Sequence, residues 1–296
     1  MILFLARLLL GTSLLAYAAL RDWKTREVDN RPWALMGGIG LLLFTLEIFH
    51  GSQDPRTYLI LAPIALIFAD AVWDRDEASR GRFLTGLLYA ASAATVILLV
   101  VYFPSFGPQG QGLLRRGFGA LVVILLAYLF YYLGLLKGGA DAKAFMSIGL
   151  LTPGYPSSGP FPLIPLDPGV LEAFELFFPF ALSTLMNSAL LLSALPLYFL
   201  MKNLLRGDFR WPQAFLGYRA DLDSLPRFAW VLQEADQGGV RYHVFPRKGS
   251  DEANLEGLRQ LGMERVWVTP QIPFLVPMTI GYVITFIVGN LLFALL

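Results

Sequence analysis

Residues 117–136, GFGALVVILLAYLFYYLGLL, contain no charged side chain and are followed at once by KGGADAKAF, residues 137–145. An α-helix of about 20 apolar residues matches the roughly 30 Å hydrocarbon core of a membrane. A carboxylate costs several kcal/mol at mid-membrane and much less at the interface. The stretch therefore predicts a membrane helix that ends close to an acidic residue, Asp141, at a membrane face.

Six further apolar runs of comparable length lie at residues 3–20, 33–49, 57–73, 83–103, 172–200 and 273–295. An eighth, AKAFMSIGLLT at 142–152, would reach only about 16 Å as a helix, so it is either a short span or a re-entrant segment. The chain is 56% hydrophobic and 15% charged. We therefore predict an all-α polytopic membrane protein with about eight membrane segments, one of them short, and a small cytoplasmic α+β insert.

The expected domains are a membrane domain at 1–200, the insert at 201–272 and a final transmembrane helix at 273–296. Within the insert, SLPRFAWVLQEADQGG (224–239) predicts a helix, with Ser224 as its cap and Pro226 in its first turn. VRYHVF (240–245) predicts a strand, residues 251–261 a second helix and RVWV (265–268) a second strand.

Basic residues indicate the orientation, because Lys and Arg are retained on the cytoplasmic side of a membrane. They gather after the first, third and fifth apolar runs, at Arg21, Lys24, Arg26, Arg31, Arg75, Arg80, Arg82, Lys137 and Lys143. The alternate loops, 50–56 and 104–116, contain only Arg56, Arg115 and Arg116. We expect a multi-pass protein of the cytoplasmic membrane, with the lipid bilayer as a partner. Its N-terminus is expected outside, and residues 21–30 and 138–145 are expected on the cytoplasmic side.

Composition excludes several kinds of chemistry. The chain has no cysteine and only two histidines, so thiol nucleophiles, disulfides and the usual zinc sites are not expected. Neither a cofactor nor a metal is predicted. A formal net charge of +1 argues against a nucleic-acid partner. The first apolar run lacks a basic leader and a small-residue cleavage site, so we expect it to be retained.

Two aspartates occupy equivalent places in the predicted topology. Asp22 in RDWKTREVDN (21–30) follows the first apolar run, and Asp141 follows the fifth; each precedes a lysine by two positions, Lys24 and Lys143. Acidic loop residues are common and often serve only solvation. The shared context, with Gly138 and Gly139 before the second aspartate, favours a functional pair, because glycine permits a tight turn and close helix approach.

These segments resemble the catalytic segments of the type IV prepilin peptidases and archaeal preflagellin peptidases, which are GxGD-type membrane aspartyl proteases. RDWKTREVDN is similar to the first segment, with Asp22, then Lys24 or Arg26, Val28 and Asn30. GGADAK is similar to the second, with Gly138, Asp141 and Lys143. Ala140 stands where the family has its second glycine, which adds one methyl to the turn. The stretches 178–191 and 269–282 are also similar to late spans of the archaeal members.

The resemblance implies an aspartic endopeptidase whose catalytic residues are Asp22 and Asp141, with Gly138, Gly139, Ala140, Lys143, Lys24 and Asn30 as supporting motif residues. It implies cleavage of a short basic leader, a class III signal peptide, from pilin-like or flagellin precursors at the cytoplasmic face. Bacterial members often carry a cysteine-rich insert and methyltransferase activity, so this chain resembles the archaeal, protease-only branch. The sequence does not distinguish between precursors.

Paired carboxylates suit this chemistry. Two aspartates within a few ångströms cannot both ionise freely, so the pair shares a proton. One then serves as general base to a water, and the protonated one donates a hydrogen bond to the scissile carbonyl.

Other polar residues have simpler predicted roles. Asp74, Asp76 and Glu77 follow the third span, and we expect them to help in recognising the substrate leader. Asp70 is predicted to serve packing or hydration, and is the best substitute for either catalytic acid. Asn187 is expected to form an interhelical hydrogen bond, and Arg7 to extend toward the outer interface.

Two alternatives remain open at this stage. The acids could bind protons or cations in a transporter or channel, and the short segment 142–152 fits the broken helices of such proteins. The membrane part could also be an anchor for the insert.

Overall fold

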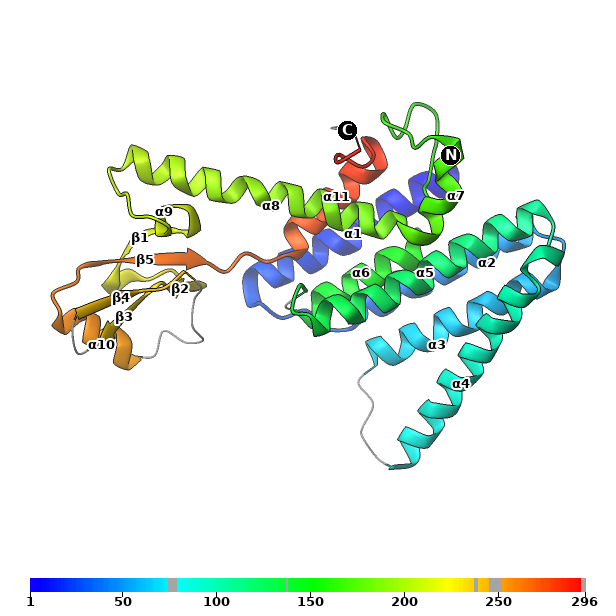
Figure 1. Ribbon diagram of the computed structural model, residues 1–296, viewed down its shortest axis with the longest axis horizontal. Coiled ribbons are helices and arrows are strands. Elements are labelled where there is room, and N and C mark those ends of the chain that lie inside the picture. Colours follow the sequence, from blue (N-terminus) through cyan, green and yellow to red (C-terminus); the bar gives the residue numbers. More distant parts are fainter. Residues whose placement is uncertain (74–78, 137, 237–238, 245–251, 294–296) are drawn as a thin grey trace. The chain divides into compact units, whose positions relative to one another are not determined.

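The computed structural model describes residues 1–73, 79–136, 138–236, 239–244 and 252–293 (Figure 1). The chain divides into two compact units, residues 1–189 with 273–296, and residues 190–272. The first unit is helical and the second is a small α+β unit. This confirms the predicted all-α membrane protein with a small α+β insert.

Six helical segments within the described ranges are long and apolar enough to cross a membrane. They are α1 (Ile2–Thr25), α2 (Arg31–Gly51), the continuous η1 and α3 (Pro55–Ile60 and Leu61–Val72), α4 (Ser79–Val101), α5 (Pro108–Tyr132) and α8 (Phe180–Leu205). The shorter helices of the first unit are η2 (Phe103–Ser105), α6 (Gly139–Leu151), α7 (Pro168–Phe177) and α11 (Leu275–Ile287).

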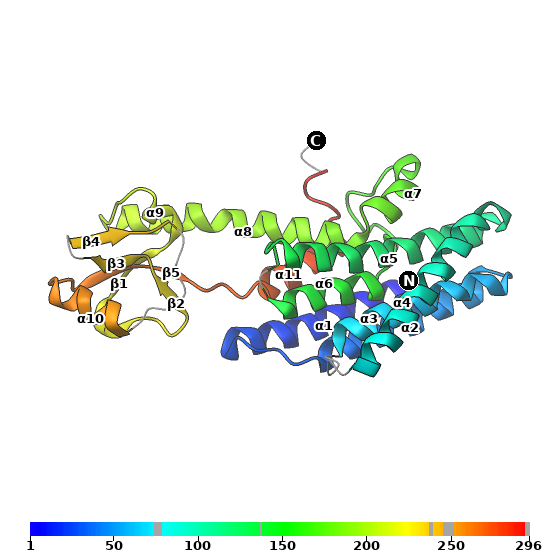
Figure 2. The ribbon, with the colours of Figure 1, turned by 60° about the horizontal axis from the view of Figure 1, so that its bottom comes forward.

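The short segment forms α6, which is buried along most of its length between α2 and α5 (Figures 1 and 2). Glycine permits this packing. A Cβ on Gly40 of α2 would lie 2.6 Å from the backbone of Leu150, and one on Gly149 of α6 would lie 2.7 Å from Val123 of α5. Such small-residue contacts allow apolar helices to approach closely without a hydrophobic driving force from water.

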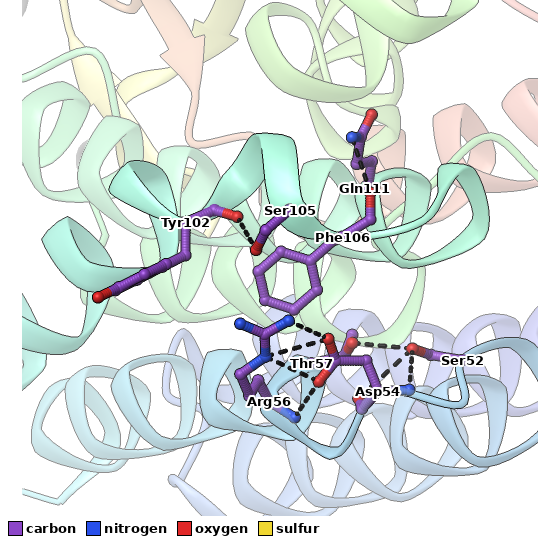
Figure 3. Close-up of polar contacts among 8 residues, drawn as sticks. All are labelled: Ser52, Asp54, Arg56, Thr57, Tyr102, Ser105, Phe106 and Gln111. Carbon is purple, nitrogen blue, oxygen red and sulfur yellow. Dashed lines mark hydrogen bonds and ion pairs between the residues drawn. The ribbon is translucent and has the colours of Figure 1, made fainter.

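Polar contacts order the loop after α2 and the loop before α5, and a cation–π contact joins the two loops (Figure 3). Arg56 forms an ion pair of 2.6 Å with Asp54 and lies 4.8 Å over the ring of Phe106. Ser52 and Thr57 share a hydrogen bond of 2.9 Å, and the amide of Gln111 donates to the Phe106 carbonyl at 2.9 Å. These contacts hold the two loops in place at the C-terminal end of α2.

Several expected spans differ in the structure. The apolar run 172–200 is two helices, because α7 ends before Pro179, whose ring restricts Phe178 and which has no N–H to donate. In the described part of the final run, residues 273–293, the helix covers 275–287 and the chain turns at Gly289, which has φ 108°. Arg115 and Arg116 lie in α5 rather than in a loop, and pair with Glu172 and Glu175 at 2.9 and 2.8 Å.

The predictions for the side chains of Asn187 and Arg7 have opposite outcomes. Asn187 of α8 donates to Thr285 of α11 at 2.9 Å and to the Gly289 carbonyl at 2.9 Å, which confirms its predicted role. Arg7 does not extend to an interface: it is 5% exposed and forms an ion pair of 2.7 Å with Glu47 of α2. An opposite charge within the second apolar run therefore holds the guanidinium inside the bundle.

The second unit contains a three-stranded sheet in the order β1-β5-β2 and a hairpin of β3 and β4, all antiparallel. The elements are α9 (Gln213–Leu216), β1 (Tyr218–Asp221), η3 (Leu222–Ser224), β2 (Ala229–Val231), β3 (Gln233–Asp236), β4 (Gly239–Tyr242), α10 (Glu252–Gln260) and β5 (Arg265–Pro270). The predicted second helix and the RVWV strand are confirmed as α10 and β5, and the VRYHVF strand is β4 over its first three residues.

The helix predicted at 224–239 is wrong. This stretch forms β2 and β3, whose alternate residues Ala229, Val231 and Ala235 pack into one cluster, while Leu232 packs with Trp267 in another. β2 and β3 pair with β5 and β4, which lie later in the chain. For β2, pairing with the distant β5 overrides the helical pattern of the local sequence, whereas β3 forms a local hairpin with β4.

Candidate active site

The two acidic segments meet at one end of the helical unit. Figure 1 shows the C-terminal end of α1 and the N-terminal end of α6 at the same end of the unit. Asp22 lies in the last turns of α1 and Asp141 in the first turn of α6. The charge of Asp22 acts on the carboxyl of Asp141, so the two acids share one electrostatic environment although 119 positions separate them (141 − 22).

Asp22 is half-buried, and its helix ends four residues later at Arg26. Arg26 has φ 60° and ψ 18°, the left-handed conformation that commonly ends helices, and its N–H donates to the Asp22 carbonyl at 3.0 Å. The chain then reverses to begin α2 at Arg31. Asp22 therefore lies in the last turns of α1, nine positions before α2 begins.

Asp141 is placed by the turn that starts α6. Gly138 caps the helix, and its carbonyl accepts from the N–H groups of Asp141 and Ala142 at 3.1 and 3.2 Å. Asp141 lies outside the six long spans. Burial raises the pKa of its carboxyl to about 7; the charge of Asp22 also raises it, while the Gly138 backbone N–H lowers it. The carboxyl is therefore able to hold a proton near neutral pH.

Gly138 and Gly139 differ in what surrounds them. A Cβ on Gly138 would lie 2.9 Å from Oδ2 of Asp141, whereas no described atom lies within 4 Å of a Cβ built on Gly139. Ala140 is half-buried and packs against the apolar core. Of the two glycines, only Gly138 has a steric reason to lack a side chain.

Lys143 and Asn30 connect the two motif segments. The Lys143 Nζ donates to Oδ1 of Asn30 at 2.8 Å. Asn30 is at the N-cap position of α2, but its side chain makes no capping hydrogen bond and so accepts from the lysine instead. Ser147, one turn further along α6, donates to the Lys143 carbonyl at 2.7 Å. Lys24, in contrast, is exposed in the last turn of α1.

Of the remaining predicted acids, the structure describes Asp70, which lies in α3. The carboxylate of Asp70 accepts a hydrogen bond of 2.9 Å from Tyr89, which joins α3 to α4. Asp74, Asp76 and Glu77 lie outside the described residues. No group of three or more His, Asp or Glu side chains that could hold a metal ion occurs in the described part of the chain.

Sequence reasoning missed the buried pair of Arg7 and Glu47, whose side chains are 6% and 14% exposed. The available signal was one charge of each sign inside two neighbouring apolar runs, since charges at such positions are rare and are usually paired. Tyr282 of α11 adds to this contact, because its hydroxyl donates to the Arg7 carbonyl at 2.8 Å.

Comparison with known proteins gives consistent matches. Residues 210–291 match the family model described as Archaeal Peptidase A24 C-terminus Type II. A preflagellin peptidase of Methanococcus voltae is 26% identical over 284 residues, which cover 93% of this chain and 92% of that protein. A preflagellin peptidase of Methanococcus maripaludis is 22% identical over 236 residues, which cover 78% of this chain and 94% of that protein.

A third relative, a preflagellin peptidase of Methanocaldococcus jannaschii, is 25% identical over 178 residues, 58% of this chain and 70% of that protein. These matches do not favour the transporter alternative. They agree with the apolar helices and with the two acidic motifs found in order along the chain. The chain is therefore similar to preflagellin peptidases over most of its length and to the archaeal A24 peptidases over residues 210–291, and these similarities, with its six apolar helices, support a multi-pass membrane protein that is an aspartic endopeptidase.

Proposed function

We propose that Asp22 and Asp141 are the catalytic pair of a membrane endopeptidase that removes the leader from flagellin precursors. The observation that supports this proposal is that α1 and α6 bring the two acids, from distant parts of the chain, to one end of the bundle, where the charge of Asp22 acts on the Asp141 carboxyl. The names of the relatives support a flagellin precursor as substrate. Pilin-like precursors with class III signal peptides are the second candidate.

In this proposal Asp141 holds the shared proton, because its carboxyl has the pKa of about 7. Ionised Asp22 takes a proton from a water, whose oxygen attacks the scissile carbonyl carbon. Protonated Asp141 donates to the carbonyl oxygen as negative charge develops there. The tetrahedral species collapses when the C–N bond breaks and the leaving nitrogen accepts the proton that Asp22 took. No covalent enzyme intermediate is required.

Cleavage of a flagellin precursor by the purified protein tests the pair. Asp22→Asn and Asp141→Asn should each abolish cleavage, because an amide can neither act as a base nor share the proton. The double variant should be no slower than either single variant, since members of one catalytic unit are non-additive. The pH profile should be bell-shaped, with two apparent pKa values that belong to the pair. Near-normal turnover by either single variant would remove the assignment, and Asp70 would be tested next.

The proposed orientation has the N-terminus outside and both acids on the cytoplasmic side, supported by the Lys and Arg distribution. The α+β insert is then cytoplasmic. The cysteine-free chain permits a direct test with an impermeant maleimide. In intact cells Gln53→Cys should be labelled and Ala253→Cys should be labelled only after lysis; both residues are exposed. The reverse pattern would refute the orientation.

Asp74, Asp76 and Glu77 are proposed to attract the basic leader of the precursor, as their charge and their place after the third span suggest. Replacing all three by their amides should raise KM for a Lys-rich leader more than for a charge-depleted one. Equal changes for both leaders would show that the acids serve only solvation.

A further inference from the structure

The segment that follows α8 exposes large apolar side chains. α8 is one of the candidate spans and ends at Leu205, and the chain continues as RGDFRW at 206–211. Leu205 is 85% exposed, Phe209 60% and Trp211 70%. Because tryptophan and phenylalanine beside the end of a span suit the membrane–water interface, this segment has the composition of a headgroup-depth anchor.

A polar pocket of about 250 Å³ opens directly beside these residues, within the α+β unit. Its lining includes Asp208, Phe209 and Arg210 from the segment after α8, together with Arg219 of β1 and Gln233 of β3. The pocket therefore begins two residues after the candidate span ends, with Gly207 as its first lining residue.

Gln233 presents an unused hydrogen-bond donor to this pocket. Its side chain is 2% exposed, and its Oε1 accepts from the Trp267 N–H at 2.6 Å. That bond fixes the amide orientation, because an N–H can donate only to the oxygen. Its Nε2 is buried and has no partner among the described residues. A buried unpaired donor costs roughly 1–3 kcal/mol, so a ligand that accepts from it would be stabilised.

The charge of the pocket indicates an anion. Asp208 is already paired with Arg219 at 3.5 Å and with Arg265 at 3.3 Å. The Nε of Arg219 is buried and has no partner in the described part of the chain. Arg210 stacks on the ring of Tyr242 at 3.4 Å, which orients its guanidinium. Two arginines against one carboxylate leave one positive charge among the lining residues, which matches the single negative charge of a phosphodiester.

We propose that this pocket binds the phosphate of an anionic glycerophospholipid headgroup. Arg210, the Nε of Arg219 and the Nε2 of Gln233 donate to the phosphate oxygens. The lipid chains lie against Leu205, Phe209 and Trp211, at the depth where α8 leaves the hydrocarbon core. A lipid is favoured over free phosphate because these apolar side chains adjoin the pocket and the pocket adjoins a candidate span. The site is separate from the proposed catalytic pair and does not depend on it.

The test uses the purified full-length chain in zwitterionic detergent, titrated with dihexanoyl phosphatidylglycerol and followed by calorimetry. We expect saturable binding, weakened about tenfold or more by Arg210→Gln and by Gln233→Glu, since each change removes a donor and the second adds a repelling charge. The glutamate still offers an oxygen to the Trp267 N–H. Arg227→Gln is the matched control, because Arg227 is exposed in the same unit and lies over the ring of Phe228 at 5.1 Å; its affinity should stay within about twofold.

Two further arms identify the source of the phosphate. Inorganic phosphate and dihexanoyl phosphatidylcholine should both bind much more weakly than phosphatidylglycerol. Inorganic phosphate that binds as tightly, and competes, would overturn the lipid assignment. An equal loss in Arg227→Gln would show only general surface charge, and unchanged binding by Arg210→Gln would also overturn the proposal. Circular dichroism confirms that each variant is folded, and Arg210 is a surface residue whose loss leaves the core intact.

Discussion

Lys143 at the start of α6 donates to Asn30 at the start of α2 across 2.8 Å, joining residues 113 positions apart in the chain. A hydrogen bond to a charged group contributes about 1.5–3 kcal/mol. The contact holds together the two segments that carry Asp22 and Asp141. We therefore propose that Lys143 and Asn30 position the two segments relative to each other.

A double-mutant cycle measures this contact. Lys143→Met and Asn30→Leu should each lower the thermal stability of the detergent-solubilised protein, and the double variant should be little worse than the single ones, because each change removes the same hydrogen bond. Lys24→Met is the control: Lys24 is exposed, and its loss should change the free energy of unfolding by at most about 0.5 kcal/mol. Fully additive losses at 143 and 30 would contradict the coupling.

Gly138 and Gly139 are adjacent in the chain but have different surroundings, so the same substitution at each allows a matched comparison. Gly138→Ala should reduce cleavage about tenfold or more while the protein remains folded, because its φ of −104° suits alanine but the new methyl would displace the Asp141 carboxyl. Gly139→Ala should retain activity, since the described structure has room for its Cβ. Steady-state turnover of a precursor peptide checks both. Comparable losses in the two variants would argue against steric control at Gly138.

The pKa of Asp141 predicts a pH-dependent stability. Its carboxyl titrates near 4 in the unfolded chain and at about 7 when folded, so the folded state binds more protons between these values. This group therefore destabilises the fold progressively as pH rises from about 4 to 7, and fully above it. Asp141→Asn should raise the melting temperature more at pH 8 than at pH 5.

Scanning both proteins in detergent at the two pH values provides the measurement. Subtracting the variant from the wild type removes the contribution of all other titrating groups that the change does not touch. A stabilising effect that is the same at pH 5 and pH 8, or larger at pH 5, would contradict the raised pKa.

Removing one partner of the pair formed by Arg7 and Glu47 should be strongly destabilising. Arg7→Leu leaves the Glu47 carboxylate buried without its cation, a change that costs about 3–5 kcal/mol. Adding Glu47→Leu should restore much of this loss, because the remaining charge is also removed. The exposed pair of Arg56 and Asp54 is the control, and Arg56→Gln should lower the stability far less than Arg7→Leu does. Chemical unfolding in detergent compares the variants.

The sequence predicted the membrane helices well because a span needs a long apolar run, which is a local property of the chain. It predicted β5 and α10 for the same reason, since each has its own local pattern. It failed at β2, whose partners in β5 lie up to 41 residues away, as between Ala229 and Pro270, and at β3, which forms a local hairpin with β4. The pairing of β2 with β5 is not encoded near the residues of β2.

The candidate site was predictable in part. Asp22 and Asp141 stood out because acids at span ends recur with the same neighbours. The contact of Lys143 with Asn30 was not predictable, because it depends on how α6 packs against α2. The different surroundings of Gly138 and Gly139 depend on where the Asp141 side chain lies in the first turn of α6. The pair of Arg7 and Glu47 was visible only as two isolated charges, and their contact depends on the relative rotation of two helices.

The close packing of Gly40 on α6 has a mechanical consequence. Gly40 meets the backbone of Leu150 near one end of α6, and Asn30 holds Lys143 near the other, so α2 and α6 are fastened at two points along their length. Arg7 joins α1 to α2 and α11 about 22 Å along the helix axis from Asp22, at 1.5 Å per residue. Asp141 thus lies on a helix that contacts α2 near both of its ends, whereas Asp22 lies far along α1 from the Arg7 contacts.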